Sequence, residues 1–159
     1  MVADTGGIGG RSVDGVNGNR CILAAQFFIM LSLQQVHHIA IICADYERSK
    51  FFYTNVLGFT VQQEVYREAR SSYKLDLALN GQYLIELFSF PDPPPRPSQP
   101  ESCGLRHLAF AVNNIETAVQ WLQQQQVVVE PIRVDEYTGK RFTFFADPDG
   151  LPLELYEEA

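Results

Sequence analysis

The sequence has few cysteines, few basic residues and no long apolar segment, and each shortage excludes a class of protein. Its three cysteines, Cys21, Cys43 and Cys103, form no C-x-x-C pair, which argues against a disulfide framework and for a reducing, cytoplasmic compartment. The 12 basic residues against 19 acidic ones leave a net charge of −7, so nothing indicates a nucleic-acid or anionic membrane partner. The apolar run at residues 21–33 is too short to span a bilayer.

What the sequence does have is an internal duplication. The segment Gly-Leu-Arg-His-Leu-Ala-Phe at 104–110 matches Val-His-His-Ile-Ala-Ile-Ile at 36–42, so that His107 corresponds to His38. Each histidine is followed, 48 residues later in the first copy and 47 in the second, by one carboxylate between apolar neighbours, Glu86 and Glu154. The spacing predicts two similar halves, each contributing one imidazole and one carboxylate.

The first half alternates between strand and helix patterns. Asp45 is a suitable N-cap for a helix, Gly58 is a suitable end for it, and Asn80-Gly81 is a strong hairpin signal. The first strand is almost wholly apolar, which predicts burial on both of its faces. The elements expected, in order, are a strand at 36–43, a helix at 45–57 and strands at 59–65, 75–79 and 83–88.

The second half repeats the order. Apolar residues recur at i, i+3, i+4 and i+7 from Ile115, which predicts a helix. Pro131 interrupts the strand that follows it and indicates a sheet edge or a bulge there. The elements expected are a strand at 105–112, a helix at 114–125 and strands at 127–134, 140–146 and 151–156.

These patterns predict an α+β protein made of two tandem βαβββ modules that form a half-barrel cup. With 46% hydrophobic residues, the chain can build a substantial core. The modules are expected at 34–90 and 104–159, joined by a stiff proline-rich linker at 91–103. Residues 1–20 lack periodicity, and 21–33 form the short apolar run. We expect residues 1–33 to be a disordered extension or, because Met30 would be a sensible initiator, a non-native one.

Strand alternation suggests that the cup holds a metal. A lone strand histidine is usually a hydrogen-bonded core residue, but His38, Glu86, His107 and Glu154 recur in register across two repeats. If the halves pair, the four groups converge, and burying them without a counter-charge would cost several kcal/mol each. A divalent cation removes that cost, and imidazole with carboxylate suits Zn, Ni, Fe, Mn or Co. By the same alternation, His37 and Arg106 are expected to point away from the metal.

Several motifs together resemble the vicinal oxygen chelate superfamily, which contains glyoxalases, bleomycin-resistance proteins and dioxygenases. They are His-Ile-Ala-Ile at 38–41, Tyr-Glu-Arg-Ser-Lys-Phe-Phe at 46–52, Ile-Glu-Leu at 85–87, and Asp-Pro-Asp-Gly-Leu-Pro-Leu-Glu-Leu at 147–155. The resemblance covers about residues 34–158 and is nearest to the YaeR-type, glyoxalase I-like bacterial proteins. It implies metal ligation by His38, Glu86, His107 and Glu154.

The resemblance also implies a chemistry. A glutamate at the second ligand position, Glu86, is similar to glyoxalase I, where a metal-site glutamate moves a proton between adjacent carbons through an ene-diolate. By this resemblance Glu154 is the candidate base and Glu86 the symmetric alternative. Glyoxalase I binds glutathione carboxylates four residues after its first and second ligands, and Ile42 and Phe90 occupy those positions here. Glutathione is therefore in doubt, and a different anionic substrate could be bound, with Arg70 and Arg141 as the candidate residues.

The function expected is a lactoylglutathione lyase-like enzyme, a lyase or isomerase that acts on a small oxygenated, possibly thiol-conjugated substrate. An extradiol-type dioxygenase, group transfer to a small molecule, and a binding protein without catalysis remain open alternatives. The modules can pair within one chain or across a homodimer, and the sequence alone does not choose, although a homodimer is the partner expected.

Overall fold

The computed structural model describes residues 31–158, which fall into two units. The first unit ends at Gln34, and its described residues, 31–34, are exposed and have no regular secondary structure. The second unit begins at Gln35 and contains all the helices and strands described here. The expectations for residues 1–33, including a start at Met30, lie almost wholly outside the described residues. No described helix is long and apolar enough to cross a membrane.

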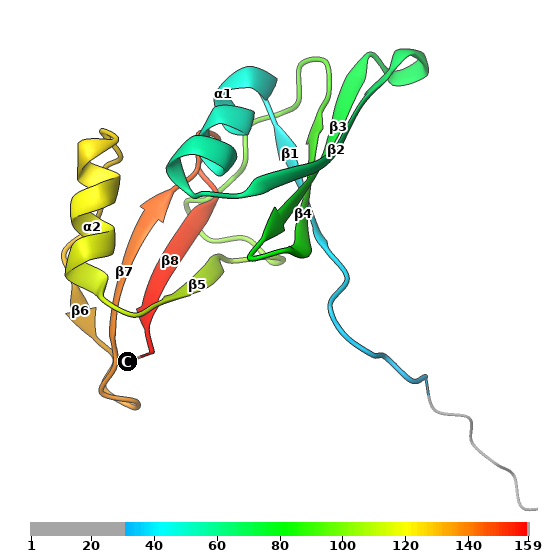
Figure 1. Ribbon diagram of the computed structural model, residues 1–159. Coiled ribbons are helices and arrows are strands. Elements are labelled where there is room, and N and C mark those ends of the chain that lie inside the picture. The colour runs from blue at the N-terminus through cyan, green and yellow to red at the C-terminus, as the bar shows by residue number, and fades with distance from the viewer. Residues whose placement is uncertain (1–30, 159) are drawn as a thin grey trace, which may run out of the picture. The chain divides into compact units, whose positions relative to one another are not determined.

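The first module has the order βαβββ (Figure 1). Its sheet has the strand order β1-β4-β3-β2, in which β1 is parallel to β4 and the other neighbours are antiparallel. The Asp45 side chain caps the first helix by accepting from the Arg48 amide, and Asn80 and Gly81 form the tight β3–β4 turn with φ of 51° and 80°. The elements are β1 (Ile39–Cys43), α1 (Tyr46–Phe51), the π-helical turn η1 (Phe52–Val56), β2 (Thr60–Arg67), the 3₁₀ turn η2 (Glu68–Arg70), β3 (Ser72–Leu79) and β4 (Gln82–Ser89).

The second module repeats this order with strands β5-β8-β7-β6. Asn114 caps α2, since its side chain accepts from the Thr117 amide at 2.7 Å. The strand expected at 127–134 is reduced to a single bridge at Val129 and a two-residue strand at the sheet edge, which confirms the edge that Pro131 indicated. The elements are β5 (Leu108–Val112), α2 (Ile115–Gln124), β6 (Arg133–Val134), β7 (Arg141–Ala146) and β8 (Pro152–Glu157). The α+β class with two βαβββ modules is thus confirmed.

Each sheet buries one face and leaves the other open. In β1, Ile41 and Cys43 are buried, whereas Ala40 is exposed and Ile42 is 54% exposed. The prediction that this strand is buried on both faces is therefore wrong. The physical reason is that β1 lies at the end of its sheet, with core packing on one side only. Burial raises the pKa of the Cys43 thiol to about 11, in keeping with the expected packing role.

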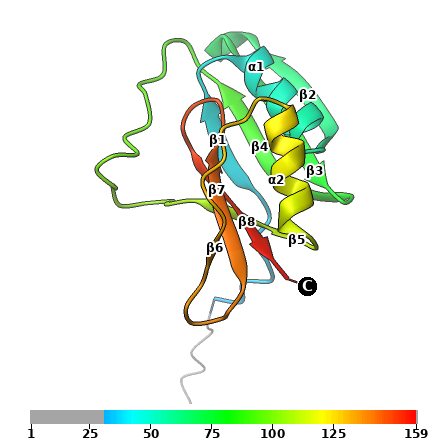
Figure 2. The same ribbon diagram turned by 90° about the vertical axis from the view of Figure 1, so that its left-hand side faces the viewer.

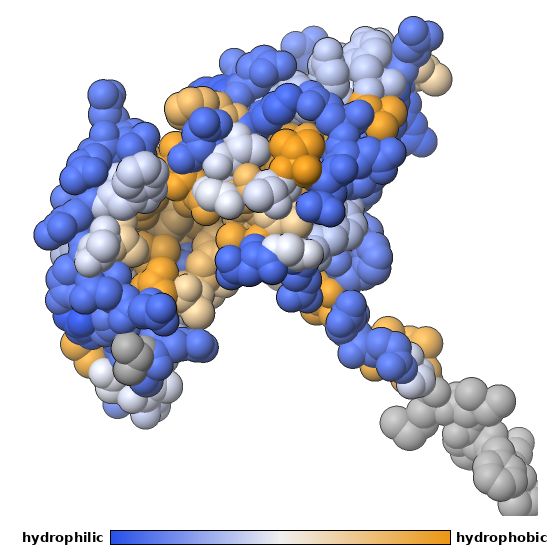
Figure 3. Space-filling view, in the orientation of Figure 1, coloured by the Kyte–Doolittle hydropathy of each residue, from blue (hydrophilic) through white to orange (hydrophobic). Residues whose placement is uncertain are grey.

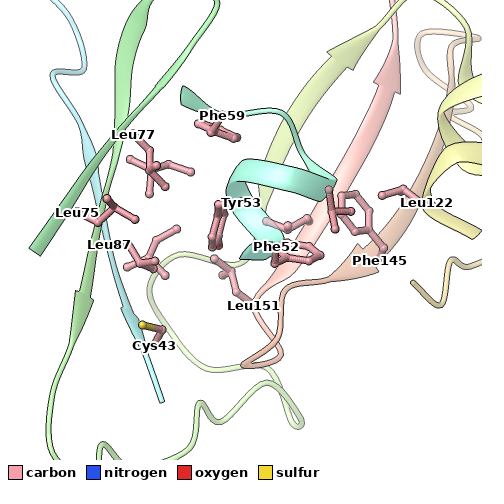
Figure 4. Packing of buried hydrophobic residues seen from close by; sticks show 14 of the residues in the cluster. Cys43, Phe52, Tyr53, Phe59, Leu75, Leu77, Leu87, Leu122, Phe145 and Leu151 are labelled. Carbon is pink, nitrogen blue, oxygen red and sulfur yellow. The ribbon is translucent and has the colours of Figure 1, made fainter. Parts of the chain in front are cut away.

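One continuous hydrophobic cluster joins the two modules (Figure 4). Phe52 and Tyr53 from η1 pack in the same cluster as Leu122 of α2 and Phe145 of β7. The Trp121 indole strengthens this contact by donating to the Val56 carbonyl at 2.8 Å. The modules therefore fold as one body around a shared core.

The Asp-Pro-Asp-Gly turn between β7 and β8 docks onto the first module. Asp147 accepts a 2.9 Å hydrogen bond from the buried Tyr53 hydroxyl. Asp149 accepts from the Ala44 amide and the Ser49 hydroxyl, both at 3.2 Å. These polar contacts cross the module boundary next to the apolar core, so they fix how the halves meet.

The proline-rich segment between β4 and β5 contains no helix or strand, as its composition predicted. Figure 2 shows it as a long arc at one side of the two sheets. The segment joins β4 of the first sheet to β5 of the second.

Candidate metal centre

The first candidate pair lies where β1 meets β4. The pairing of Ala40 with Glu86 in the parallel ladder puts the carboxylate beside the start of β1. His38 immediately precedes that strand, and its Nε2 lies 3.2 Å from Glu86 Oε2. The glutamate side chain is 14% exposed and the histidine side chain 35% exposed. An imidazole nitrogen and a carboxylate oxygen thus meet at the open face of the first sheet.

Two further polar residues from β3 join this pair. Lys74 Nζ lies 2.8 Å from Glu86 Oε1 and 2.5 Å from Asp76 Oδ1, so its ammonium bridges two carboxylates. Burial acts to lower the pKa of Lys74, but hydrogen bonds to Asp76 and Glu86 outweigh it and raise the pKa. The Tyr83 hydroxyl also donates to Asp76, and burial, with the nearby carboxylates, raises its pKa to about 12.

The second candidate pair repeats the geometry in β5 and β8. Ala109 pairs with Glu154 in the parallel ladder, and His107 Nε2 lies 3.0 Å from Glu154 Oε2. The surroundings differ, because Phe144 occupies the position that Asp76 holds in the first module. The Phe144 ring lies edge-on to the His107 ring at 5.2 Å. Glu154 is buried against an apolar wall and has no ammonium partner among the described residues.

Two expectations about neighbouring residues are wrong for one reason. His37 and His38 both contact Tyr83, and their Nδ1 atoms lie 2.8 Å apart, so His37 does not point to the other face. Likewise Arg106 Nη1 lies 3.0 Å from His107 Nδ1 instead of facing away. Both pairs precede their strands, which begin at Ile39 and Leu108, so strand alternation does not apply to them.

The structure brings the four predicted ligands together as two pairs but not as one set. Among residues 31–158, no three histidine, cysteine, aspartate or glutamate side chains are grouped closely enough to hold a metal. The reason lies in the topology: β1 and β5 each lie at the end of a separate sheet, with one edge unpaired in either sheet. The half-barrel expected from the repeats is therefore not closed within one chain. Figure 3 shows apolar surface exposed in the hollow over β5.

The chemistry of the donors nevertheless fits a divalent metal. Each pair offers one imidazole nitrogen and one carboxylate oxygen at the open face of its own sheet. The carboxylate side chains are only 14% and 12% exposed. Two such pairs would supply four ligands, enough for a catalytic site that retains open positions. The fit of the metal thus depends on bringing two half-sites together.

The two basic residues predicted to bind substrate lie away from the pairs. Arg70 is exposed at the β2–β3 tip, six residues along from Asp76, or about 20 Å of extended chain. Arg141 forms ion pairs with Glu116 and with Glu157, the latter at 2.6 Å from Nε. Their role in substrate binding remains a prediction that these positions do not favour.

Sequence reasoning did not single out Lys74, Asp76 or Tyr83. The signal was present for Asp76, which alternates with the apolar residues of the strand expected at 75–79, as Glu86 does in the next strand. Lys74 belongs to β3 only because that strand begins earlier than expected, at Ser72. Their pairing with Glu86 follows from the β3–β4 register, which the Asn80-Gly81 turn fixes.

A cavity of about 490 Å³ lies next to Arg106 and Phe144, the two neighbours of His107. Its walls come from the proline-rich segment and from β7, and include Arg96, Arg106, Arg133 and Phe144. Two of the lining residues, Arg106 and Phe144, contact His107, but neither His107 nor Glu154 lines the cavity itself. The cavity has room for a small molecule.

Comparison with known proteins places these pairs in context. The sequence profile of the Glyoxalase/Bleomycin resistance protein/Dioxygenase superfamily matches residues 35–155. The uncharacterized protein YaeR of Escherichia coli (strain K12) is 70% identical over 129 residues, 81% of this chain and 100% of that protein.

Solved structures of proteins from the same superfamily have a similar fold. The glyoxalase family protein from Enterococcus faecalis is 50% identical, with a TM-score of 0.73, over 78% of this chain and 98% of that one. The trypanothione-dependent glyoxalase I of Leishmania major is 25% identical, with a TM-score of 0.60, and the match covers 79% of this chain and 88% of the Leishmania chain.

Proposed function

Because the chain belongs to the Glyoxalase/Bleomycin resistance protein/Dioxygenase superfamily, we propose that it is a metal-dependent, glyoxalase I-like lyase or isomerase acting on a small oxygenated substrate. The observation that carries the proposal is the repeated pair, His38 with Glu86 and His107 with Glu154, at 3.2 and 3.0 Å. A divalent ion such as nickel, zinc or cobalt bound by these four residues would polarise two substrate oxygens.

We propose that two copies of the chain complete each site. Within one chain, β1 and β5 are end strands of separate sheets that do not pair with each other. We therefore propose that their free edges meet between two chains. Ala40, Ile42 and the two alanines of β5 are exposed near the half-sites, and pairing would cover them. A two-fold dimer would then contain two identical centres, because each interface contact occurs twice.

The surroundings distinguish the two carboxylates. Glu86 already accepts from the Lys74 ammonium through Oε1, whereas Oε2, on the His38 side, remains for a metal. Glu154 faces His107 and is paired with Phe144 in the ladder, and it has no ammonium partner among the described residues. We therefore assign Glu154 as the base that moves a proton between adjacent substrate carbons, with Glu86 as a structural ligand.

The similarity to one glyoxalase I supports the reaction class that we propose, but it does not identify the thiol. The trypanothione-dependent enzyme is an example of a glyoxalase I that uses another thiol than glutathione. In this chain Ile42 and Phe90 cannot bind a glutathione carboxylate, so a different thiol conjugate or a free oxygenated compound is the substrate that we propose.

The test is metal analysis followed by turnover. We expect the purified chain to bind one nickel, cobalt or zinc ion per chain and to isomerise methylglyoxal hemithioacetals of small thiols better than that of glutathione. Oxygen consumption with a catechol would instead indicate a dioxygenase. Failure to bind any of these ions, or iron or manganese, would reject the proposal in favour of a metal-free binding protein.

A further inference from the structure

Arg67 lies on the same open face as the first candidate pair. It ends β2, and its guanidinium carbon lies 4.5 Å from the centroid of the Phe88 ring and 5.5 Å from that of Phe90. Phe88 is two residues after Glu86 on β4, so the two side chains share a face. The guanidinium is therefore held over an aromatic floor next to the half-site.

The hydrogen bonds of Arg67 orient its charge without neutralising it. Its Nε and Nη2 donate to the hydroxyl of the buried Ser72 at 3.1 and 2.6 Å. Within the described part of the chain, no carboxylate forms an ion pair with Arg67, and its Nη1 has no hydrogen-bond acceptor. A guanidinium fixed by a neutral hydroxyl and two rings retains donors for an anion.

The comparison within the chain is Arg133, which is also stacked on two phenylalanines. Its guanidinium carbon lies 4.9 Å from the Phe142 ring centroid and 5.4 Å from that of Phe144. Unlike Arg67, it forms an ion pair with Glu130 at 2.9 Å. An arginine stacked on two rings can therefore still have a carboxylate partner. That Arg67 has none among the described residues is a local property of the first module.

The position of Arg67 sets a length for the ligand. Two residues along a strand span about 7 Å, so Arg67 lies roughly 7–10 Å from the oxygens that a metal at Glu86 would hold. Phe90 is apolar and cannot bind an anion itself, but its ring is one of the two that the Arg67 guanidinium stacks on.

We propose that Arg67 binds a carboxylate or phosphate group of the substrate, in a bidentate contact, at this distance from the reacting oxygens. The inference rests on the proposed function for the identity of the reacting end. The anion subsite itself is a property of Arg67, Ser72 and the two rings. The substrate class is therefore a small oxygenated compound with an anionic group about two strand residues away from its chelating oxygens.

The test uses the full-length chain without added metal, so that it does not depend on turnover. Inorganic phosphate and acetate are titrated separately, and the side-chain Nε–H resonance of Arg67 is followed by ¹H–¹⁵N NMR, assigned by its loss in Arg67→Met. We expect saturable shifts in the wild type. We also expect backbone amide shifts around Phe88 to report at least about tenfold weaker anion binding in Arg67→Met. Tighter binding of phosphate or of acetate identifies which anion the subsite takes.

Two further variants complete the test. Arg48→Met removes an exposed arginine of α1 that has no place in either candidate pair or in the cavity, and we expect its anion binding to equal that of the wild type. Arg67→Lys retains the positive charge but loses the two parallel N–H donors of the guanidinium, so it should bind the anion weakly. This variant keeps the proposal testable if Arg67→Met fails to fold. An Arg67 resonance that neither anion shifts saturably, or equal affinities for the wild type and Arg67→Lys, would overturn the proposal. Metal binding measured on the same samples reports separately on the proposed function.

Discussion

The hydrogen bond between Tyr53 and Asp147 offers a direct measure of how strongly the two modules are joined. Tyr53 is fully buried, and its hydroxyl donates to Asp147 Oδ2 at 2.9 Å. Burial and the charge of Asp147 raise the pKa of Tyr53 above its usual range, so the hydroxyl remains a donor at any working pH. Replacing Tyr53 by phenylalanine removes this bond and keeps the ring that fills the core.

The expected cost follows from what remains after the change. A hydrogen bond to a charged group contributes about 1.5–3 kcal/mol. Asp147 Oδ1 keeps its two amide donors, from Asp149 at 2.9 Å and Leu151 at 2.8 Å, so the aspartate is not left wholly unsatisfied. We therefore expect Tyr53→Phe to lose about 2 kcal/mol of unfolding free energy and roughly 6–8 °C in melting temperature.

The assay is urea unfolding followed by fluorescence of Trp121, the single tryptophan. Its indole contacts the Val56 carbonyl across the module boundary, so its signal reports on that boundary. Tyr137→Phe is the matched control, because Tyr137 is 90% exposed and should change stability by less than about 0.5 kcal/mol. If Tyr53→Phe were no more destabilising than this control, the polar contact would not hold the modules together.

Two other predictions concern the carboxylates. Burial raises the pKa of Asp147, so the stability that this group contributes is full below its unfolded pKa, near 3.8, and is lost as pH rises through the higher folded value. Asp147→Asn should remove this decline. The check is the urea midpoint of the wild type and of Asp147→Asn, measured across a pH series. If the two midpoints changed with pH in the same way, the reasoning would be wrong. At the metal centre, Glu154→Gln should abolish turnover while weakening cobalt binding less than His107→Ala does. Turnover by Glu154→Gln equal to that of the wild type would reject its role as base.

Much of the fold could be predicted because local signals agreed with the tertiary structure. Asp45 caps α1, Gly58 ends the following turn with a φ of 78°, and Asn80-Gly81 turns the β3–β4 hairpin. The duplicated spacing also placed each histidine beside its own glutamate. The periodicity could not reveal the switch from α to π geometry at Phe52, because a one-residue shift in hydrogen bonding keeps both Phe52 and Tyr53 facing the core.

The way in which the two halves meet was beyond the sequence pattern. Strand alternation gives the face of Glu86 and Glu154 but does not fix whether β1 joins β5 of its own chain. That outcome depends on side-chain packing between segments far apart in sequence, such as Tyr53 against Asp147 and Trp121 against Val56. Likewise, only the three-dimensional contacts separate Arg67, which has no carboxylate partner in the described chain, from Arg141, which has two.

The central claim is that one metal is held by the His38–Glu86 pair of one chain and the His107–Glu154 pair of another. Cobalt binding by mixed variants tests it without knowledge of the substrate. His38→Ala and His107→Ala dimers should each bind the ion poorly, since each lacks one imidazole in both centres. After unfolding and refolding together, half of the dimers would be mixed and each would regain one intact centre, which restores about one quarter of the wild-type sites. A mixture that binds no more cobalt than the separate variants would contradict the account.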